Sequence, residues 1–293
     1  MNAPAARYRG RFAPSPTGPL HFGSLVAAVA SYLRARSQQG DWLVRMEDID
    51  PPREPPGAAA GILRSLETFG LEWDGQVLYQ STRLDAYRHH IRDLTERGLA
   101  FPCSCSRRDI EEVLGERKPG QSAVYPGLCR DGPRRPDADC AIRLRVPDRS
   151  VGFEDLLQGR FEQHLRRQVG DFVLQRKDGM TAYQLAVVLD DAQQGITEVC
   201  RGTDLLDNTP RQIFLQQTLG LPTPHYLHFP LVLASAGEKL SKQTGAPALD
   251  AARASDIMTE VLRFLGLPPD DALRGAPPAE QLAWATSRWD IEM

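Results

Sequence analysis

The segment RFAPSPTGPLHFGS, residues 11–24, decides how the N-terminal part of the chain folds. Residues 7–13 are predicted to form a short strand. The prolines that follow cannot lie inside a helix or a central strand, because proline lacks the N–H donor. Apolar residues then recur at helical spacing, namely Leu25, Val26, Val29 and Leu33. The pattern predicts a strand, a rigid loop and the start of a helix, in that order.

A strand, a loop and a helix N-terminus in this order are typical of a phosphate-binding site. The first N–H groups of the helix and the positive end of its dipole point at the ligand. Gly18 and Gly23 would let a nucleotide approach the backbone closely, and His21 adds a donor. The alternative is an ordinary proline-rich turn before a core helix, and spacing alone favours that alternative.

A second candidate segment, GEKLSKQ, covers residues 237–243. Lys239 and Lys242 lie three residues apart beside Ser241, on a predicted loop. Lysine is a mobile point charge that suits a loop closing over a triphosphate. A solvated surface loop is the alternative, and it is again the one that spacing alone favours.

The remaining pattern predicts an α/β fold. Residues 42–46 read as a second strand, and helical spacing recurs at 62–69 and 87–94, so the first hundred residues indicate a parallel sheet covered by helices. Residues 185–189 and 229–233 are predicted to be buried strands of the same sheet. Thr209-Pro210 is predicted to cap and open a further helix.

Composition narrows the class of protein. The chain has 293 residues, of which 41% are hydrophobic and 25% are charged, and this excludes disorder, collagen and coiled coil. The formal net charge of −3 neither indicates nor excludes a nucleic-acid partner. No apolar run is long enough to span a bilayer, and the first residues do not read as a signal peptide. A cytoplasmic protein with no membrane association is therefore expected.

Cysteines gather in residues 101–182, a segment that reads as an insertion. Cys103, Cys105 and Cys129 fall within a short span, and thiolates are preferred zinc ligands. Cys140 is a candidate for a fourth ligand. Buried cysteine without metal is an equal alternative on spacing alone. Elsewhere Cys200 is interpreted as core, and His225 and His228 as structural residues.

Taken together, the two candidate phosphate segments resemble the HIGH and KMSKS signatures of class I aminoacyl-tRNA synthetases. The longer match RFAPSPTG, residues 11–18, and the match VRMEDID, residues 44–50, resemble the glutamyl branch of that family. Two positions depart from the family pattern. Ser24 stands where HIGH has its last histidine, and Gln243 ends the second signature.

The resemblance implies a division of the chain. A Rossmann-type catalytic domain would cover residues 1–100 and 183–243, an inserted zinc-bearing, acceptor-type subdomain residues 101–182, and a short helical C-terminal region residues 244–293. ATP with Mg²⁺ would lie between the two signatures, with His21, Lys239 and Lys242 as the catalytic residues. The implied ATP-binding residues are Pro14, Thr17, Gly18, His21, Gly23, Ser24, Lys239, Ser241 and Lys242.

The resemblance also implies an amino-acid pocket and a structural zinc site. Arg11 and Arg201 would recognise a carboxylate of L-glutamate and Glu47 its ammonium group, while Tyr183 and Ser15 complete the pocket. Without the resemblance, a structural ion pair or a surface charge is the better interpretation of Glu47 and Arg201. The implied zinc ligands are Cys103, Cys105, Tyr125 and Cys129.

The chain is too short to hold an anticodon-reading domain, because only 50 residues follow Gln243. It resembles the short bacterial members of the glutamyl branch. That resemblance implies activation of glutamate without tRNA, then transfer to queuosine at the wobble position of tRNA(Asp), by a monomeric enzyme. Three alternatives remain: a synthetase that charges a tRNA 3′ end, a small-molecule nucleotidyltransferase, and a non-catalytic RNA-binding relative.

Overall fold

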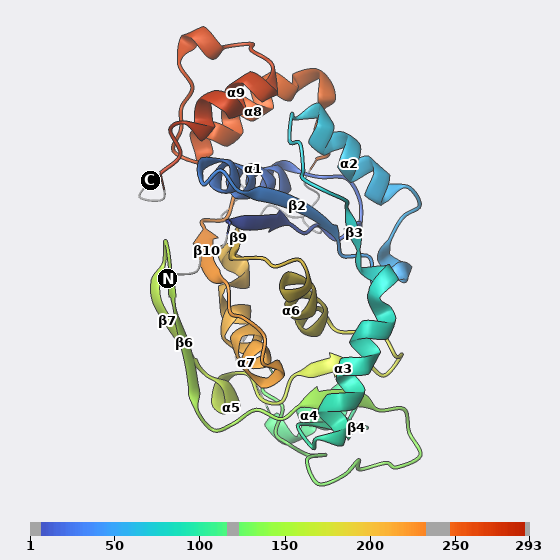
Figure 1. Ribbon diagram of the computed structural model, residues 1–293. Coiled ribbons are helices and arrows are strands. Elements are labelled where there is room, and N and C mark those ends of the chain that lie inside the picture. The colour runs from blue at the N-terminus through green and yellow to red at the C-terminus, as the bar shows by residue number, and fades with distance from the viewer. Residues whose placement is uncertain (1–6, 116–122, 233–246, 291–293) are drawn as a thin grey trace.

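The computed structural model describes residues 7–115, 123–232 and 247–290 (Figure 1). The strands are β1 (Arg9–Phe12), β2 (Asp41–Met46), β3 (Leu78–Tyr79), β4 (Ala100–Cys103), β5 (Ala141–Leu144), β6 (Ser150–Asp155), β7 (Gly159–His164), β8 (Val173–Gln175), β9 (Glu198–Gly202) and β10 (His225–Phe229). The α-helices are α1 (Phe22–Ser37), α2 (Ala58–Thr68), α3 (Leu84–Glu96), α4 (Arg107–Leu114), α5 (Leu165–Gln168), α6 (Tyr183–Gln193), α7 (Thr209–Leu219), α8 (Ala254–Phe264) and α9 (Pro278–Thr286).

Two parallel sheet segments meet edge to edge. In one, β1, β2 and β3 pair in that order, and in the other β10 lies between β9 and β6, with β7 antiparallel at the edge. The N–H of Thr197 donates to the carbonyl of Arg9 at 2.9 Å, which holds the two edges together. The strand order is therefore β3-β2-β1-β9-β10-β6-β7. The strand order reverses between β1 and β9, because β2 and β3 follow β1 on one side and β10 follows β9 on the other. Sheets of this kind bind ligands at such a point, beyond the carboxyl ends of their strands.

Helices cover both faces of this sheet. Helices α1, α8 and α9 lie on one side and α6 and α7 on the other (Figure 1). One apolar core joins α1, β1 and β2 to α2, α8 and α9, and a second core joins α3, α6 and α7 to the far part of the sheet. The predicted α/β fold with a parallel sheet is confirmed.

The predicted strand at residues 185–189 is wrong. These residues lie inside helix α6 and are buried, so their apolar run lacks the polar face that normally marks a helix. The strand that follows β1 in the sheet is β9, with the sequence EVCRG. Its charged residues Glu198 and Arg201 are buried with partners, and this hid the strand in the sequence pattern.

Two further boundaries differ from the sequence prediction. The strand predicted at residues 229–233 is misplaced, because β10 covers His225–Phe229, shares only Phe229 with it and is followed by Pro230. Leu233 itself lies outside the described residues. Helix α7 is confirmed, but Asn208 is its N-cap, so Thr209 is its first helical residue. Both shifts leave the predicted order of elements intact.

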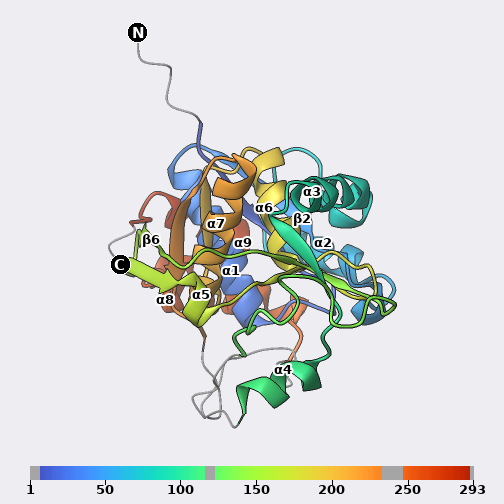
Figure 2. The same cartoon turned by 90° about the horizontal axis from the view of Figure 1, so that it is seen from below.

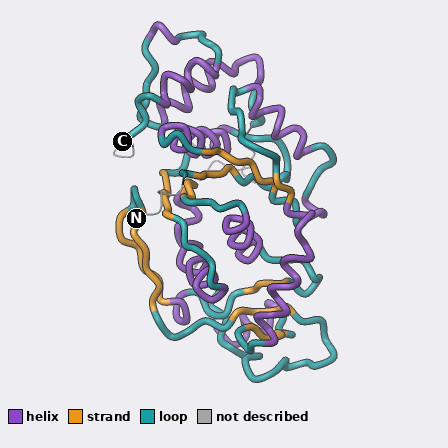
Figure 3. Tube along the Cα trace, viewed as in Figure 1, coloured by secondary structure: helices purple, strands orange, loops and turns teal. Residues whose placement is uncertain are grey.

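Residues 101–182 contribute to two sheets. Strands β4, β5 and β8 form an antiparallel sheet of their own, whereas β6 pairs with β10 of the parallel sheet. The β6–β7 hairpin extends along one side of the molecule (Figure 3). Helix α4 lies at the opposite end from α8 and α9, at the margin of the molecule (Figures 1 and 2). The division of the chain into domains stays a prediction.

Within the described ranges, none of the helices is long and apolar enough to cross a membrane.

Candidate functional site

A cavity of about 270 Å³ opens where β1 and β9 end, next to the N-terminus of α1. It brings together residues that the sequence analysis assigned to ATP and residues that it assigned to glutamate. The predicted residues that line it are Arg11, His21, Gly23, Ser24, Glu47, Tyr183 and Arg201. The place matches the crevice expected at the reversal point of the sheet.

A second cavity of about 380 Å³ adjoins the first, because Glu47 and Tyr183 line both. Ser15 and Thr17 line the second cavity. The predicted residues Pro14 and Gly18 line neither. The carbonyl of Pro14 accepts the N–H of Glu47 at 3.0 Å, and Gly18 has a φ of 141°, which suits glycine. Lys239, Ser241 and Lys242 lie outside the described residues.

His21 caps helix α1. Its Nδ1 accepts the N–H of Ser24 at 3.3 Å, and the Ser24 hydroxyl accepts the N–H of His21 at 2.9 Å. This reciprocal pair is a capping box, which fixes both side chains at the helix start. A neutral imidazole that accepts at Nδ1 carries its proton on Nε2, so His21 presents a donor there. Ser24, which departs from the family signature, completes the cap.

Arg11, on β1, is held by Asp191 from helix α6. Its Nε lies 3.0 Å from Asp191 Oδ1 and its Nη2 lies 3.4 Å from Oδ2. Both side chains are buried. Burial alone would lower the pKa of Arg11, but the Asp191 carboxylate raises it above its ordinary value. The guanidinium therefore stays charged and fixed beside the cavity.

Arg45, on β2, shares the same carboxylate. Its Nη1 lies 2.8 Å from Asp191 Oδ1 and donates to Gln194 Oε1 at 2.8 Å. The side chain is fully buried, and within the described ranges its Nε and Nη2 have no hydrogen-bond partner. One aspartate therefore pairs with two buried arginines, and Glu47 is a further carboxylate near Arg45.

Glu47 is a buried carboxylate at the boundary of the two cavities. Its Oε1 lies 3.6 Å from Arg45 Nη2 and accepts no hydrogen bond from the described part of the chain. Burial raises its pKa to about 7, although Arg45 and Arg11 oppose the shift. A cationic group in the cavity would stabilise the ionised Glu47 carboxylate, because its charge would compensate for the hydration that the carboxylate loses on burial.

Arg201 lies on β9 and lines the same cavity as Arg11, which lies on β1. Its Nε donates to His228 Nε2 at 3.0 Å and its Nη2 to Thr209 Oγ1 at 2.8 Å. Nη1 is buried and has no partner in the described chain. A buried guanidinium nitrogen left unpaired costs stability, so a site of this kind favours an anionic ligand.

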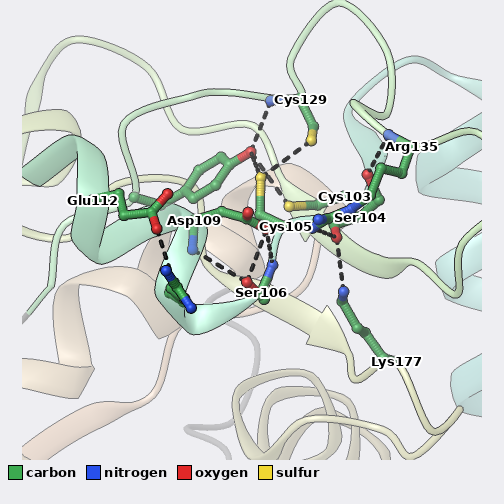
Figure 4. A network of polar contacts seen from close by, with 11 residues as sticks. Cys103, Ser104, Cys105, Ser106, Asp109, Glu112, Cys129, Arg135 and Lys177 are labelled. Atoms are coloured by element: carbon green, nitrogen blue, oxygen red, sulfur yellow. Dashed lines mark hydrogen bonds and ion pairs between the residues drawn. The ribbon is translucent and has the colours of Figure 1, made fainter.

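Three buried thiols lie together at the end of β4 (Figure 4). The sulfurs of Cys103, Cys105 and Cys129 all lie within 4.8 Å of one another. The Tyr125 hydroxyl lies 3.3 Å from the Cys103 sulfur and 3.9 Å from that of Cys105. The same hydroxyl oxygen accepts the backbone N–H of Cys129 at 2.8 Å. The predicted four residues are thus brought to one place.

The loop that carries the first two thiols is anchored by its neighbours. The Ser104 carbonyl accepts bonds from Arg135 Nη2 at 3.0 Å and Lys177 Nζ at 2.8 Å (Figure 4). Cys140, the alternative fourth ligand, is not part of the thiol cluster, and its thiol donates to the Ala138 carbonyl at 3.3 Å. The cluster could hold one metal ion.

Sequence reasoning missed three buried residues behind the cavity, and it gave His228 only a structural role. Asp191 pairs with both Arg11 and Arg45, while His228 contacts Arg201 and Asp155 contacts His228. The sequence did contain a sign of a buried charge at Arg45, because this residue is charged and lies inside an apolar strand. Asp191 gave none that spacing could detect, because it lies 180 positions from Arg11.

The chain matches known proteins over most of its length. Residues 7–270 match the family model described as tRNA synthetases class I (E and Q), catalytic domain. It is 55% identical to the glutamyl-Q tRNA(Asp) synthetase of Ectopseudomonas mendocina, over 97% of this chain and 93% of that protein. It is 54% identical to the protein of the same name from Neisseria meningitidis, over 97% of this chain and 96% of that protein.

Solved structures agree with this match. The glutamate tRNA ligase of Elizabethkingia meningosepticum, in complex with its amino acid, superposes with a TM-score of 0.71 at 29% identity and covers 82% of this chain. The matched part is 52% of that ligase, so the present chain spans about half of it. The glutamate-tRNA synthetase of Elizabethkingia anophelis gives the same TM-score of 0.71.

Replacing Asp191 by Asn should strongly destabilise the fold, because it removes the carboxylate that pairs directly with both buried arginines, Arg11 and Arg45. We expect urea unfolding to show a loss of about 3–5 kcal/mol. Asp93→Asn is the matched control, since its 2.8 Å pair with Arg97 is solvent-exposed and should contribute less than about 1 kcal/mol. Equal small losses in both variants would contradict the charge balance described here.

Proposed function

The chain belongs to the class I tRNA synthetase family (E and Q), and we propose that it activates L-glutamate with ATP, without tRNA, and then transfers glutamate to queuosine at the wobble position of tRNA(Asp). The observation that carries the activation step is the cavity in which two buried arginines and a buried glutamate meet the capped start of α1. The acceptor is supported by the names of the relatives, which share almost the whole chain.

Activation needs positioning and charge neutralisation and no protein nucleophile. A carboxylate oxygen of glutamate attacks the α-phosphorus of ATP, a new P–O bond forms, and the bond to pyrophosphate breaks. Negative charge grows on the phosphates, and donors fixed in advance stabilise it. His21 is suitably placed for this role at the start of α1. Lys239 and Lys242 are proposed to act with it, and bound Mg²⁺ would supply further positive charge.

The cavity fits an amino acid with two carboxylates. The unpaired Nη1 of Arg201 and the fixed guanidinium of Arg11 are proposed to receive a carboxylate. Glu47 is proposed to receive the ammonium group, and Tyr183 and Ser15 to complete the pocket. Both cavities reach Glu47 and Tyr183, which leaves room for a second substrate beside the amino acid.

Transfer completes the proposed reaction. A hydroxyl of the queuosine cyclopentenediol attacks the carbonyl carbon of glutamyl-adenylate, an ester bond forms, and AMP leaves with the electrons of the broken C–O bond. The modified base lies in a loop of the tRNA, where bases can be turned outward into a protein pocket. We further propose that the enzyme acts as a monomer in the cytoplasm.

The function is tested by ATP–pyrophosphate exchange with glutamate and Mg²⁺ in the absence of tRNA. We expect exchange with the unaltered protein, and a rate about 100-fold lower with His21→Ala, because one transition-state donor is lost. Labelled glutamate should then be transferred to tRNA(Asp) that carries queuosine and not to tRNA(Asp) that lacks it. Exchange without glutamate, or label on the 3′-terminal ribose, would support the alternative functions instead.

Glutamate binding should depend on pH through Glu47, whose pKa lies at about 7. Its ionised form binds the ammonium group, so the KM for glutamate should fall as pH rises through 7. Between pH 6 and pH 8 we expect a decrease of about tenfold. Glutarate, which has no ammonium group, is the control inhibitor, and its inhibition constant should not improve over this range. A KM independent of pH would contradict the role of Glu47.

We also propose that the thiol cluster holds one structural zinc ion. Tetrahedral zinc with thiolates at about 2.3 Å requires sulfurs about 3.8 Å apart, and the Cys105 and Cys129 sulfurs lie 3.4 Å apart. Tyr125 is proposed as the fourth ligand, because its hydroxyl contacts two of the thiols and accepts the Cys129 N–H. The ion would tie the β4 loop to the segment around Cys129.

Metal analysis tests the zinc site. Protein produced with zinc present should contain about one zinc per chain, and Cys129→Ser should lose it because one of four ligands is gone. Cys140→Ser is the matched control and should keep the metal. A protein without zinc, or one that loses it on replacement of Cys140, would contradict this ligand set.

A further inference from the structure

A chain of buried side chains lies behind Arg201. Asp155, at the end of β6, contacts His228 on β10, and His228 contacts Arg201 on β9. The Asp155 Oδ2 to His228 Nδ1 distance is 2.6 Å, and Arg201 Nε donates to His228 Nε2 at 3.0 Å. All three side chains are buried. These contacts connect three neighbouring strands of the sheet, and they end at Arg201, which lines the cavity.

The contact with Arg201 fixes the protonation of His228. A guanidinium has only N–H donors, so His228 Nε2 must accept and cannot carry a proton. The proton of the neutral ring then lies on Nδ1, where it donates to Asp155 Oδ2. Tyr226 stacks nearly parallel to the imidazole, with a centroid distance of 6.1 Å, and Phe153 lies at 6.2 Å. The ring therefore has little freedom to turn.

Asp155 is itself fixed by the backbone. Its Oδ1 accepts the N–H groups of Leu157, Gln158 and His228, at 3.1, 2.9 and 3.2 Å. Only Oδ2 is left for the imidazole. The orientation of the carboxylate, and through it the tautomer of His228, is thus determined by the turn that follows β6.

Arg201 is consequently held on two of its three nitrogens. Nε is fixed by His228 and Nη2 by Thr209, while Nη1 has no partner among the described residues and belongs to a side chain that lines the cavity. We propose that Asp155 and His228 are positioning residues that orient Arg201 so that Nη1 receives the carboxylate of the substrate. This inference rests on the proposed function, because glutamate supplies that carboxylate, and it gives His228 more than the structural role predicted from the sequence.

Asp155→Asn, an almost isosteric change, tests the contacts that run from Asp155 through His228 to Arg201. The side-chain oxygen of Asn must stay with the three backbone N–H groups, so its NH₂ group would face His228 Nδ1. His228 would then carry its proton on Nε2 and oppose the N–H of Arg201, as in triads where the wrong tautomer is imposed. His228→Gln is the conservative second variant, because an amide oxygen near the position of Nε2 can still accept from Arg201.

The expected result is a selective loss of glutamate binding in ATP–pyrophosphate exchange. Asp155→Asn should raise the KM for glutamate about tenfold to 100-fold, the effect of losing one hydrogen bond to a charged group, and should change the KM for ATP less than about threefold. His228→Phe should behave similarly and His228→Gln should recover part of the loss. Gln158→Ala is the matched control, since its side chain donates to the backbone carbonyl of His228, at 2.8 Å, and alanine keeps the backbone N–H that donates to Asp155.

Nitrogen NMR of histidine tests the same inference in the unaltered protein, and a variant is needed only to assign the signals. The His228 signals, assigned by their loss in His228→Phe, should show a protonated Nδ1 and an unprotonated Nε2. A protonated Nε2, or an Asp155→Asn variant with an unaltered glutamate KM, would overturn the inference. If the unaltered protein shows no exchange, the proposed function is overturned instead. The NMR result would still decide whether His228 Nε2 accepts from Arg201, as the inference requires.

Discussion

The candidate site depends on one buried carboxylate that pairs with two arginines at once. Asp191 of α6 contacts Arg11 of β1 and Arg45 of β2, at distances of 3.0 and 2.8 Å. Removing such charges from water is costly unless their geometry is good, so the pairing determines how α6 packs against the sheet. The same packing brings Tyr183, the first residue of α6, and Glu47, which follows β2, to the boundary of both cavities.

Opposite this cluster, Arg201 is bound from behind by neutral groups. His228 and Thr209 hold it, and no carboxylate in the described ranges pairs with its charge, whereas Arg11 pairs with Asp191. The two arginines therefore differ in what they offer a ligand. Arg11 supplies a fixed, largely compensated charge, and Arg201 supplies an uncompensated one with an unpaired nitrogen. A buried site with that imbalance is completed by an anion, which is the physical basis for proposing a carboxylate substrate.

Short-range patterns predicted much of this molecule. The strand, proline loop and helix at residues 9–37 depend on neighbours in the sequence. The cap made by His21 and Ser24 is equally local, but it was not predicted, because His21 was interpreted only as a donor to a ligand. Residues 185–189 were misread because a helix buried on most sides loses its amphipathic period. Asp191 and Asp155 were missed because their partners lie 180 and 73 positions away, and no local pattern records contacts between elements that only the sheet brings together.

The central claim is that the cavity at the reversal of the sheet is a glutamate site completed by Arg201 and Glu47. A crystal structure of the protein with glutamate tests it most directly. Our account places one carboxylate within hydrogen-bond distance of Arg201 Nη1 and the ammonium group beside Glu47. Glutamate bound in that cavity with its ammonium group toward Arg201, or bound elsewhere on the molecule, would contradict it.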